Sequence, residues 1–432
     1  MAKKFKRYYA AVNYIESLSN IKLKKYESIE ASLIEKNKRF VFFMNRLGNP
    51  HLHLKYIHIT GSSGKGSVAT MIHSILVECG YKTGLFLSPH TTAKIDRIRI
   101  NNSFISPDSF ADILERIKPV IEEMKNDKNI GRPTHFQVCL AIAFLYFAQK
   151  KCDYVVLEVG CGGKLDATNI IPTPIAAIIN LVDYDHEKIL GHTLTAIAKA
   201  KAGIIKPNTA LFTTYRNKPL VLNILKKECQ KKKAKFNLVK TSKKHYQLSM
   251  AGEHQQDNAS LAAAVARFLK IPEDAINQGL KKAKLPCRFE IIQKKPLVII
   301  DGAHNSSKMK TTLASLADLT YSRLFLIIAL SHSKEPNSIF NDIIRKADKV
   351  YITCHQNHFH HCFNPNQLKK ELSVAKQSQK ILTISNPQTA LEQALKQAKE
   401  DDAILITGSL YLAGELRKHW IPEKVILKKR KA

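Results

Sequence analysis

The residues best suited to chemistry in this chain lie in a glycine-rich segment, residues 61–67, whose sequence is GSSGKGS. An apolar run that is typical of a β-strand leads into it. Glycines let backbone N–H groups converge on phosphate oxygens, Lys65 adds a mobile positive charge, and the Ser67 hydroxyl can bind Mg²⁺ where a helix begins. The segment is shorter than the common G-x-x-x-x-G-K-[ST] loop, and a plain turn is the alternative. We interpret Gly64, Lys65, Gly66 and Ser67 as phosphate-binding residues.

Two further candidate ligands follow apolar runs in the same half of the chain. Glu158 closes the run 154–157, and glycines after it would let a ligand approach the backbone. His186 ends the polar segment 183–186, which follows the next run. In parallel sheets, ligands collect beyond the carboxyl ends of the strands, where a carboxylate can hold Mg²⁺. Glu158 could instead cap a loop amide, and His186 could be an ordinary loop histidine.

Lys201 shares one face of a predicted helix with Leu194, Ile197 and Ala198. A lysine held on an apolar face loses solvation, and its neutral amine can react with CO₂ to give a carbamate that supplies negative charge to a metal. The alternative is a lysine that extends to solvent near a helix end, which Gly203 would mark.

In the second half of the chain, Asp301 and His304 follow the apolar run 297–300. Asp301 could accept a hydrogen bond from a ribose or orient His304, or it could be a simple turn aspartate. Residues 354–362 contain several cysteines and histidines, but their spacing fits no regular zinc motif. We interpret that segment as a polar loop, with a metal site as the alternative.

Short apolar runs alternate with amphipathic helical patterns, which predicts parallel sheets with helices on both faces. Strands are expected at 55–60, 83–87, 154–159, 175–181, 210–213, 297–300, 324–329, 350–353, 381–384 and 403–407. Helices are expected after the glycine-rich loop, at 106, 134 and 193, and near 255. Residues 281–286 are polar and contain a proline, so we interpret them as a linker between two α/β domains, 1–285 and 288–432.

The bulk composition restricts the class of protein. A chain of 432 residues is too long for one core, and its 44% hydrophobic content can fill two. The formal net charge is +32, but the lysines are scattered and no nucleic-acid module interleaves them with aromatics. The eight cysteines form no C-x-x-C pair, and no apolar run approaches the roughly 20 residues of a membrane helix. We expect a cytosolic monomer that acts on small molecules and engages neither a membrane nor a specific nucleic acid.

These segments, taken in order, resemble the folylpolyglutamate synthase and dihydrofolate synthase family, a branch of the Mur ligase superfamily. The resemblance extends from about Arg46 to Glu415. It includes residues 47–51, 58–67, 87–90, 97–101, 157–169, 185–186, 189–191, 201–206, 252–258, 288–290, 301–305 and 407–409. Gly66 directly after Lys65 favours the folate branch, because the cell-wall ligases typically carry threonine there.

The resemblance implies an ATP-dependent ligase that joins L-glutamate to a pteridine carboxylate through an acyl phosphate. It implies an N-terminal P-loop ATPase domain with a mostly parallel sheet and a C-terminal Rossmann-like α/β domain. By the same resemblance, one Mg²⁺ binds Ser67 and Glu158, a second binds His186, Lys201 is carbamylated, and His304 lies close to the transferred phosphate. ATP would also contact Asn258, Arg288 and Asp301.

The pteridine side is implied to be lined by Thr134, Phe136, Gln137, Leu165, Asp166 and Ala167. The family carries glutamate where Gln137 and Ala200 stand and arginine where Lys164 stands. The choice between dihydropteroate and tetrahydrofolate therefore stays open. The alternatives are a Mur-type ligase with a non-folate substrate and a non-catalytic protein that binds nucleic acid or phosphate on this fold.

Overall fold

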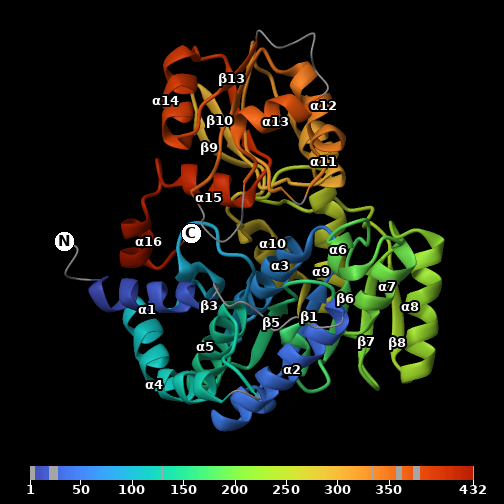
Figure 1. The fold of residues 1–432 in the computed structure, drawn as a ribbon. Coiled ribbons are helices and arrows are strands. Elements are labelled where there is room, and N and C mark those ends of the chain that lie inside the picture. The colour runs from blue at the N-terminus through green and yellow to red at the C-terminus, as the bar shows by residue number, and fades with distance from the viewer. Residues whose placement is uncertain are drawn as a thin grey trace.

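The computed structural model of the chain contains two mixed β-sheets, each covered by helices on both faces (Figure 1). It describes residues 5–18, 28–127, 130–332, 334–356, 362–372 and 380–431. All strands up to Val239 belong to the first sheet, and all strands from Glu290 belong to the second. This arrangement confirms the predicted α/β class.

The first sheet has eight strands in the order β4-β3-β2-β5-β1-β6-β7-β8. They are β1 (Tyr56–Thr60), β2 (Thr83–Phe86), β3 (Ile98–Ile100), β4 (Ser103–Phe104), β5 (Tyr154–Glu158), β6 (Ala176–Ile179), β7 (Ala210–Thr214) and β8 (Lys235–Val239). The central β1 is parallel to both neighbours, whereas β3 and β4 add an antiparallel edge. The sequence prediction missed β3, β4 and β8, because β3 and β4 are very short and β8 has no buried residue.

Successive strand residues face opposite sides, so this sheet has a core on each face. On one face, Ile57 and Ile59 pack with α3 (Lys65–Glu78), α9 (His254–Phe268) and α10 (Glu273–Lys282). On the other face, Tyr56 packs with α1 (Lys6–Ser17), α2 (Ile29–Arg46), α4 (Pro107–Asn126) and α5 (His135–Gln149). The helices α7 (Leu194–Ala202) and α8 (Pro219–Lys232) cover β6 and β7. The central strand is thereby fixed from both sides.

Three predicted helix starts are confirmed by side-chain caps. Ser106 accepts a hydrogen bond from the Ser109 N–H, with a proline at the first helical position of α4. Thr134 accepts one from the Gln137 N–H at the start of α5, and Thr193 caps α7 in the same way. Such caps satisfy N–H groups that have no partner inside the helix.

The second sheet has six strands in the order β13-β12-β11-β14-β10-β9. They are β9 (Glu290–Lys294), β10 (Leu297–Ile300), β11 (Leu324–Ile328), β12 (Lys349–Ile352), β13 (Ile381–Thr383) and β14 (Ala403–Thr407). Only the unpredicted β9 is antiparallel to its neighbour. One face is covered by α11 (Ser306–Ala317), α12 (Pro336–Lys346) and α13 (Pro365–Glu371), and the other by α14 (Pro387–Gln397) and α15 (Leu410–Arg417).

The two sheets are joined by more than the segment predicted as a linker. Lys281 and Lys282 form the end of α10, so only the residues after them connect the sheets. The C-terminal helix α16 (Glu423–Lys429) returns to the first sheet, where Ile426 and Leu427 enter the core beside α1 (Figure 1). The predicted division at 285–288 stays a prediction. Within the described ranges, no helix is both long and apolar enough to span a bilayer.

Candidate active site

The glycine-rich loop lies between the central strand β1 and helix α3, as predicted. Gly64 directly precedes α3 with φ of 74°, in the left-handed region that favours glycine. A Cβ atom at Gly64 would lie 2.2 Å from Asn180 Nδ2 and 2.5 Å from Asn258 Oδ1. A side chain therefore cannot be accommodated at this position, for steric as well as conformational reasons.

The first N–H groups of α3 have no acceptor within the helix, and no side chain caps them. Together with the positive end of the helix dipole, they make this end of α3 suited to bind an anion. Lys65 Nζ donates to the Gly61 carbonyl oxygen at 2.9 Å, so the side chain folds back over its own loop. This contact is to a neutral oxygen, and the charge of Lys65 remains available to a phosphate.

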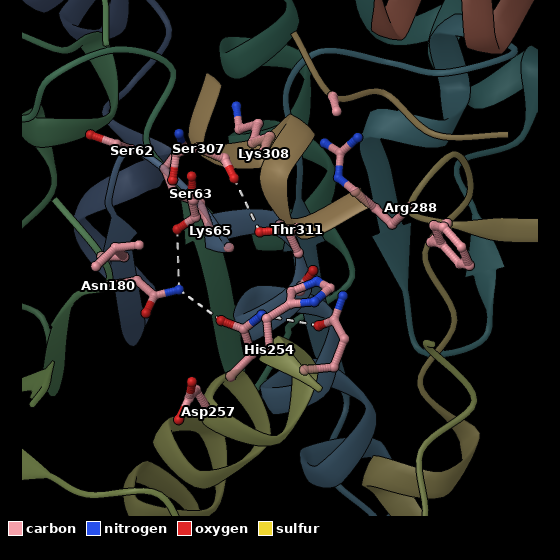
Figure 2. A pocket seen from close by; sticks show the side chains of 18 of the residues that line it. Ser62, Ser63, Lys65, Asn180, His254, Asp257, Arg288, Ser307, Lys308 and Thr311 are labelled. Carbon is pink, nitrogen blue, oxygen red and sulfur yellow. Dashed lines mark hydrogen bonds between the residues drawn. The ribbon is translucent and has the colours of Figure 1, made fainter. Parts of the chain in front are cut away.

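A cavity of about 170 Å³ opens above this loop, between the two sheets. Glu158 lines this cavity. So do all seven residues that the sequence predicted to bind the nucleotide, which are Gly64, Lys65, Gly66, Ser67, Asn258, Arg288 and Asp301. Figure 2 shows Lys65, Arg288 and Lys308 among its side chains. Segments more than 200 residues apart in sequence thus meet at one site.

An amide network fixes the floor of the cavity (Figure 2). Asn180 Nδ2 donates to Asn258 Oδ1 at 2.8 Å and to the Ser63 carbonyl oxygen at 3.1 Å. Asn258 in turn donates to Gln255 Oε1 at 3.0 Å. Asn180 follows β6 and was not predicted as a site residue, because an asparagine after a strand has no distinctive pattern.

Both carboxylate oxygens of Asp301 accept hydrogen bonds from other residues of the chain. Its Oδ1 accepts from the Ala303 N–H and the Thr312 hydroxyl, both at 2.9 Å, and its Oδ2 accepts from the Phe289 N–H at 2.8 Å. These bonds join the start of β9 to the loop that carries His304. Asp301 therefore shapes the cavity wall, whether or not it also contacts a ligand.

Glu158 ends β5 and reaches the cavity beside Gly66 and Ser67. Its Oε2 accepts from the Ser88 N–H at 3.0 Å, so it does cap a loop amide, while it also faces the cavity. Burial raises the pKa of Glu158, against the influence of nearby Lys65. A bound cation would stabilise the charged form of this carboxylate.

Asp185 and His186 do not line this cavity, but Asp185 interacts with Lys308, which does, and it bridges the two halves of the chain. Lys334, from the second half, places its Nζ 3.0 Å from Asp185 Oδ1, and His186 Nε2 is 3.7 Å from Asp185 Oδ2. Burial raises the pKa of Asp185, but Lys308, His186 and Lys334 outweigh it, so the net shift is strongly downward. Asp185 is thus a fixed negative charge among several cations.

Lys201 is buried in α7, with only 2% of its surface exposed. Burial, and next the charge of Lys65, lower the pKa of Lys201 to about 7. The alternative of a solvent-reaching lysine is therefore wrong. Burial also lowers the pKa of His186, to about 4, so this imidazole is neutral near pH 7.

His304 lies at the same edge, in the loop after β10. Its Nδ1 is 2.9 Å from the Gly302 carbonyl oxygen, and its Nε2 is 3.0 Å from Lys308 Nζ. Lys308 itself borders the cavity. The sequence prediction missed Lys308, because a lysine in the first turn of a helix is usually a solvent-exposed residue.

A second, larger cavity of about 890 Å³ lies on the face of the first sheet covered by α2, α7 and α8, and the loop that follows β5 and Glu158 lines it. All six residues predicted for the pteridine side line it: Thr134, Phe136, Gln137, Leu165, Asp166 and Ala167. Thr134 and Gln137 use their polar groups to cap α5, so they shape the wall. The Asp166 carboxylate is held by the Cys161 N–H at 2.9 Å and by the Thr168 hydroxyl at 2.6 Å.

The wall of this larger cavity is strongly basic. It carries six lysines: Lys36, Lys164, Lys199, Lys227, Lys231 and Lys232. Among the described residues that line this cavity, Glu30, Glu228 and Asp166 are the acidic ones. Part of the +32 net charge is therefore concentrated at a cavity rather than spread evenly.

The cysteine and histidine segment 354–362 is described only in part, because residues 357–361 lie outside the described ranges. His355 is buried against Tyr411, with ring centroids 5.5 Å apart. The alternative of a metal site in that segment stays a hypothesis.

Comparison with known proteins agrees with this geometry. Residues 59–266 match the Mur ligase middle domain, and residues 287–410 match the Mur ligase glutamate ligase domain. The dihydrofolate synthase/folylpolyglutamate synthase of Bacillus subtilis is 30% identical over 406 residues, which cover 87% of this chain and 92% of that protein.

Solved structures of folylpolyglutamate synthases are also similar to this chain. The folylpolyglutamate synthase of Mycobacterium tuberculosis, complexed with ADP, superimposes with a TM-score of 0.86 at 26% identity, over 96% of this chain and 99% of that one. The folylpolyglutamate synthase of Thermotoga maritima gives a TM-score of 0.77 at 31% identity, over 98% and 99% of the two chains.

Proposed function

Because the chain belongs to the folylpolyglutamate synthase and dihydrofolate synthase family of ATP-dependent ligases, we propose that it joins L-glutamate to the carboxylate of a pteridine substrate. The observation that carries this proposal is a pair of cavities to which the end of β5 and the loop after it both contribute. One is lined by a phosphate-binding loop and cations from both sheets, and the other is large, partly apolar and basic. A nucleotide in the first and an anionic aromatic substrate in the second would meet at the segment that ends β5 and lines both cavities.

The proposed chemistry has two steps. In the first, a carboxylate oxygen of the pteridine substrate forms a bond to the γ-phosphorus of ATP, and the bond to the β,γ-bridging oxygen breaks, releasing ADP. In the second, the amine of glutamate attacks the acyl carbon, phosphate leaves, and the amine loses a proton. A carboxylate is a poor electrophile, and phosphorylation supplies the leaving group that it lacks.

The phosphates would be held by the N–H groups of residues 64–67 and by Lys65 and Arg288. In phosphoryl transfer the protein acts mainly by positioning and by neutralising charge. Lys65 and Arg288 approach from different sheets, so both charges act together only when the two halves of the chain are closed over the nucleotide. Asn258 would then contact the nucleotide through the amide that Asn180 orients.

The residues present fit one Mg²⁺ beside the phosphates. Glu158 and Ser67 face the same cavity, and the raised pKa of Glu158 marks a buried carboxylate that a cation would stabilise. Among the described residues, no three or more His, Cys, Asp and Glu side chains are arranged to bind a metal alone. That suits an ion held partly by ATP oxygens. We propose Ser67 and Glu158 as its protein ligands; bound Mg²⁺ would neutralise phosphate charge.

A second ion would be held by His186 together with a carbamate on Lys201. The neutral amine of Lys201 can bond to the carbon of CO₂ and release a proton, which leaves an anion in place of a cation. His186 is neutral near pH 7, as a metal ligand must be. The lysines around His186 would otherwise repel a metal.

The larger cavity would hold the pteridine substrate. Phe136, Leu165 and Ala167 offer apolar contacts there. The Asp166 carboxylate is engaged by Cys161 and Thr168, so it shapes the wall between them. The lysines of the wall would attract the carboxylates of the substrate. This assignment leaves open whether dihydropteroate, tetrahydrofolate or both are used, since Thr134 and Gln137 are engaged in capping.

We also propose that the enzyme acts as a cytosolic monomer, with the chain divided at 285–288. Size-exclusion chromatography with light scattering tests the monomer. Limited proteolysis tests the division, since cleavage should concentrate between α10 and β9, while α16 stays bound to the first sheet.

The direct test supplies the purified chain with Mg²⁺-ATP, L-glutamate, and either dihydropteroate or tetrahydrofolate, and follows products by mass spectrometry. A glutamate-extended pteridine and ADP should appear only when all substrates are present. The matched control is Lys65→Met, which should form neither. If the wild-type chain extends neither pteridine, the proposed function is wrong.

A further inference from the structure

The hydrogen bonds of His304 determine which atom of this loop can donate to a phosphate. Nδ1 lies 2.9 Å from the Gly302 carbonyl oxygen, which can only accept, so Nδ1 carries the proton. Burial, and next the charge of Lys308, lower the pKa of His304 well below its usual value, so the ring is neutral. Nε2 therefore presents a lone pair, and Lys308 Nζ donates to it at 3.0 Å.

This arrangement makes His304 unsuited to bind a phosphate directly. A lone pair on Nε2 would repel a phosphate oxygen, and the only N–H of the ring is already used. Lys308, by contrast, has three N–H groups when protonated and spends one on His304. Two remain for a ligand in the cavity.

Lys308 is placed firmly at the cavity wall. It stands in the first turn of α11, and its backbone N–H is fixed by Asn305 Oδ1 at 2.9 Å. Its side chain is half-buried because it borders the same cavity as Lys65 and Arg288 (Figure 2).

The charge of Lys308 is not matched by a direct partner. In the described part of the chain Lys308 forms no ion pair, and the nearest influential carboxylate, Asp185, is bound to Lys334. Burial lowers the pKa of Lys308 to about 7; Asp185 opposes this shift, whereas Lys65, Arg288 and Lys334 add to it. An ammonium group crowded by cations is stabilised when an anion enters between them.

We propose that Lys308 is a catalytic residue that binds the oxygens of the phosphoryl group while it passes from ATP to the substrate carboxylate, and that His304 is the positioning residue that orients it. This inference rests on the proposed function and deepens it. Lys308 transfers no proton: the new bond joins the carboxylate oxygen to the γ-phosphorus, and the bond to the bridging oxygen breaks. Together, Lys65, Arg288 and Lys308 would neutralise the charge from three directions.

The experiment compares Lys308→Met with Lys308→Arg in the full chain. The matched control is Lys310→Met, which removes an exposed lysine from the same helix. Dissociation constants for ATP and ADP and the turnover number for glutamate ligation are measured for each, with thermal melting as a check of folding. Lys308→Met should weaken ATP about tenfold and change ADP binding little, because ADP lacks the γ-phosphate. Its turnover should fall by about 100-fold, the usual cost of losing one such donor.

Lys308→Arg should restore part of the ATP preference, and Lys310→Met should match the wild type. His304→Ala should also reduce the preference for ATP over ADP, and it should make a further Lys308→Met substitution nearly silent. A purely structural role of His304 would lower stability without moving the ratio of ATP to ADP affinity.

The inference is wrong if Lys308→Met keeps the ATP-to-ADP affinity ratio and the turnover number within roughly threefold of wild type. A failure of this inference can be distinguished from a failure of the proposed function. The nucleotide ratio tests Lys308 even if no pteridine is extended, and ligation by the wild type tests the function whatever Lys308 does. If Lys308→Met does not fold, the same ratio is read from Lys308→Arg and His304→Ala.

Discussion

The two cavities are built in opposite ways. The smaller one, at the glycine-rich loop, is lined from both sheets and held by two sets of hydrogen bonds. One set joins Asn180 to Asn258, and the other joins Asp301 to its own part of the wall. Among the described residues, those that line the larger one all belong to the first sheet and its helices, up to Lys232, and six of them are lysines. The smaller cavity suits a fixed reaction geometry, and the larger suits substrates that differ in size and charge. Substitutions should therefore separate nucleotide chemistry from pteridine selection.

Lys65→Met should have the largest effect. It removes the charge of the phosphate-binding loop while leaving the larger cavity intact, so turnover should fall by at least about 1,000-fold. Binding of the pteridine substrate, followed by fluorescence or calorimetry, should change little. Lys310→Met serves as the control, and an equal loss of pteridine affinity would contradict the separation of the two cavities.

Lys201→Met should lower turnover by about 100-fold, since it removes the charge that the carbamate would supply. Lys201→Ala leaves space, and added formate or acetate should restore part of its activity. Unchanged activity, or no rescue by any small carboxylate, would remove the carbamate role of Lys201.

The lowered pKa of Lys201 also predicts a pH dependence with a definite sign. The neutral amine is the reactive form, so activity should fall as the pH drops below about 7. The folded protein disfavours the charged form of Lys201, whose pKa is 10.5 when the lysine is exposed to solvent and about 7 in the fold. Lys201 therefore destabilises the folded state increasingly as the pH falls from 10.5 to about 7, and its full cost is reached below about pH 7. Lys201→Met should therefore raise the melting temperature more at pH 6 than at pH 9. Equal changes at both pH values would mean that Lys201 is not the buried titrating group.

Phe136→Ala should raise the KM for the pteridine by about 10-fold to 100-fold and leave the KM for ATP nearly unchanged. The ring borders the larger cavity, and it packs edge-on to Phe86 with centroids 5.9 Å apart. Losing an aromatic contact typically costs about 1–3 kcal/mol of binding. Steady-state kinetics in each substrate measure the split. A parallel rise in the KM for ATP would show that the two cavities are not independent.

The double variant Lys227→Gln, Lys231→Gln should have the smallest effect. These lysines lie one helical turn apart on α8 and border the larger cavity. Exposed charges contribute little each, so the KM should rise roughly twofold to fivefold, more for a folate with several glutamates than for dihydropteroate, and less at high salt. Lys226→Gln, Lys233→Gln is the control pair. Equal effects on both substrates would contradict a role of these lysines in selecting substrates by their charge.

The sequence was sufficient for the parts that depend on local pattern. The glycine-rich loop, the caps at Ser106, Thr134 and Thr193, and most parallel strands follow from residue type and spacing. Glu158 could be placed because it directly ends an apolar run. The edge strands β4 and β8 could not, since they are stabilised by neighbours rather than by their own apolar residues.

The missed site residues have a common physical cause. Asn180 and Lys308 acquire their roles from contacts with Asn258 and His304, and those contacts depend on packing. The burial of Lys201 was foreseen as one of two possibilities, and only the packing of α7 decides between them. Sequence spacing can indicate a face of a helix, but not what that face meets.

The central claim, that the pteridine carboxylate is phosphorylated before glutamate is joined to it, is tested most directly by an isotope. The wild-type chain is given ATP, L-glutamate and a pteridine whose carboxylate carries ¹⁸O, and the released phosphate is analysed by mass spectrometry. An acyl phosphate intermediate predicts that one labelled oxygen moves from each carboxylate into phosphate as the glutamate-extended product forms. Product formation with unlabelled phosphate would contradict the account.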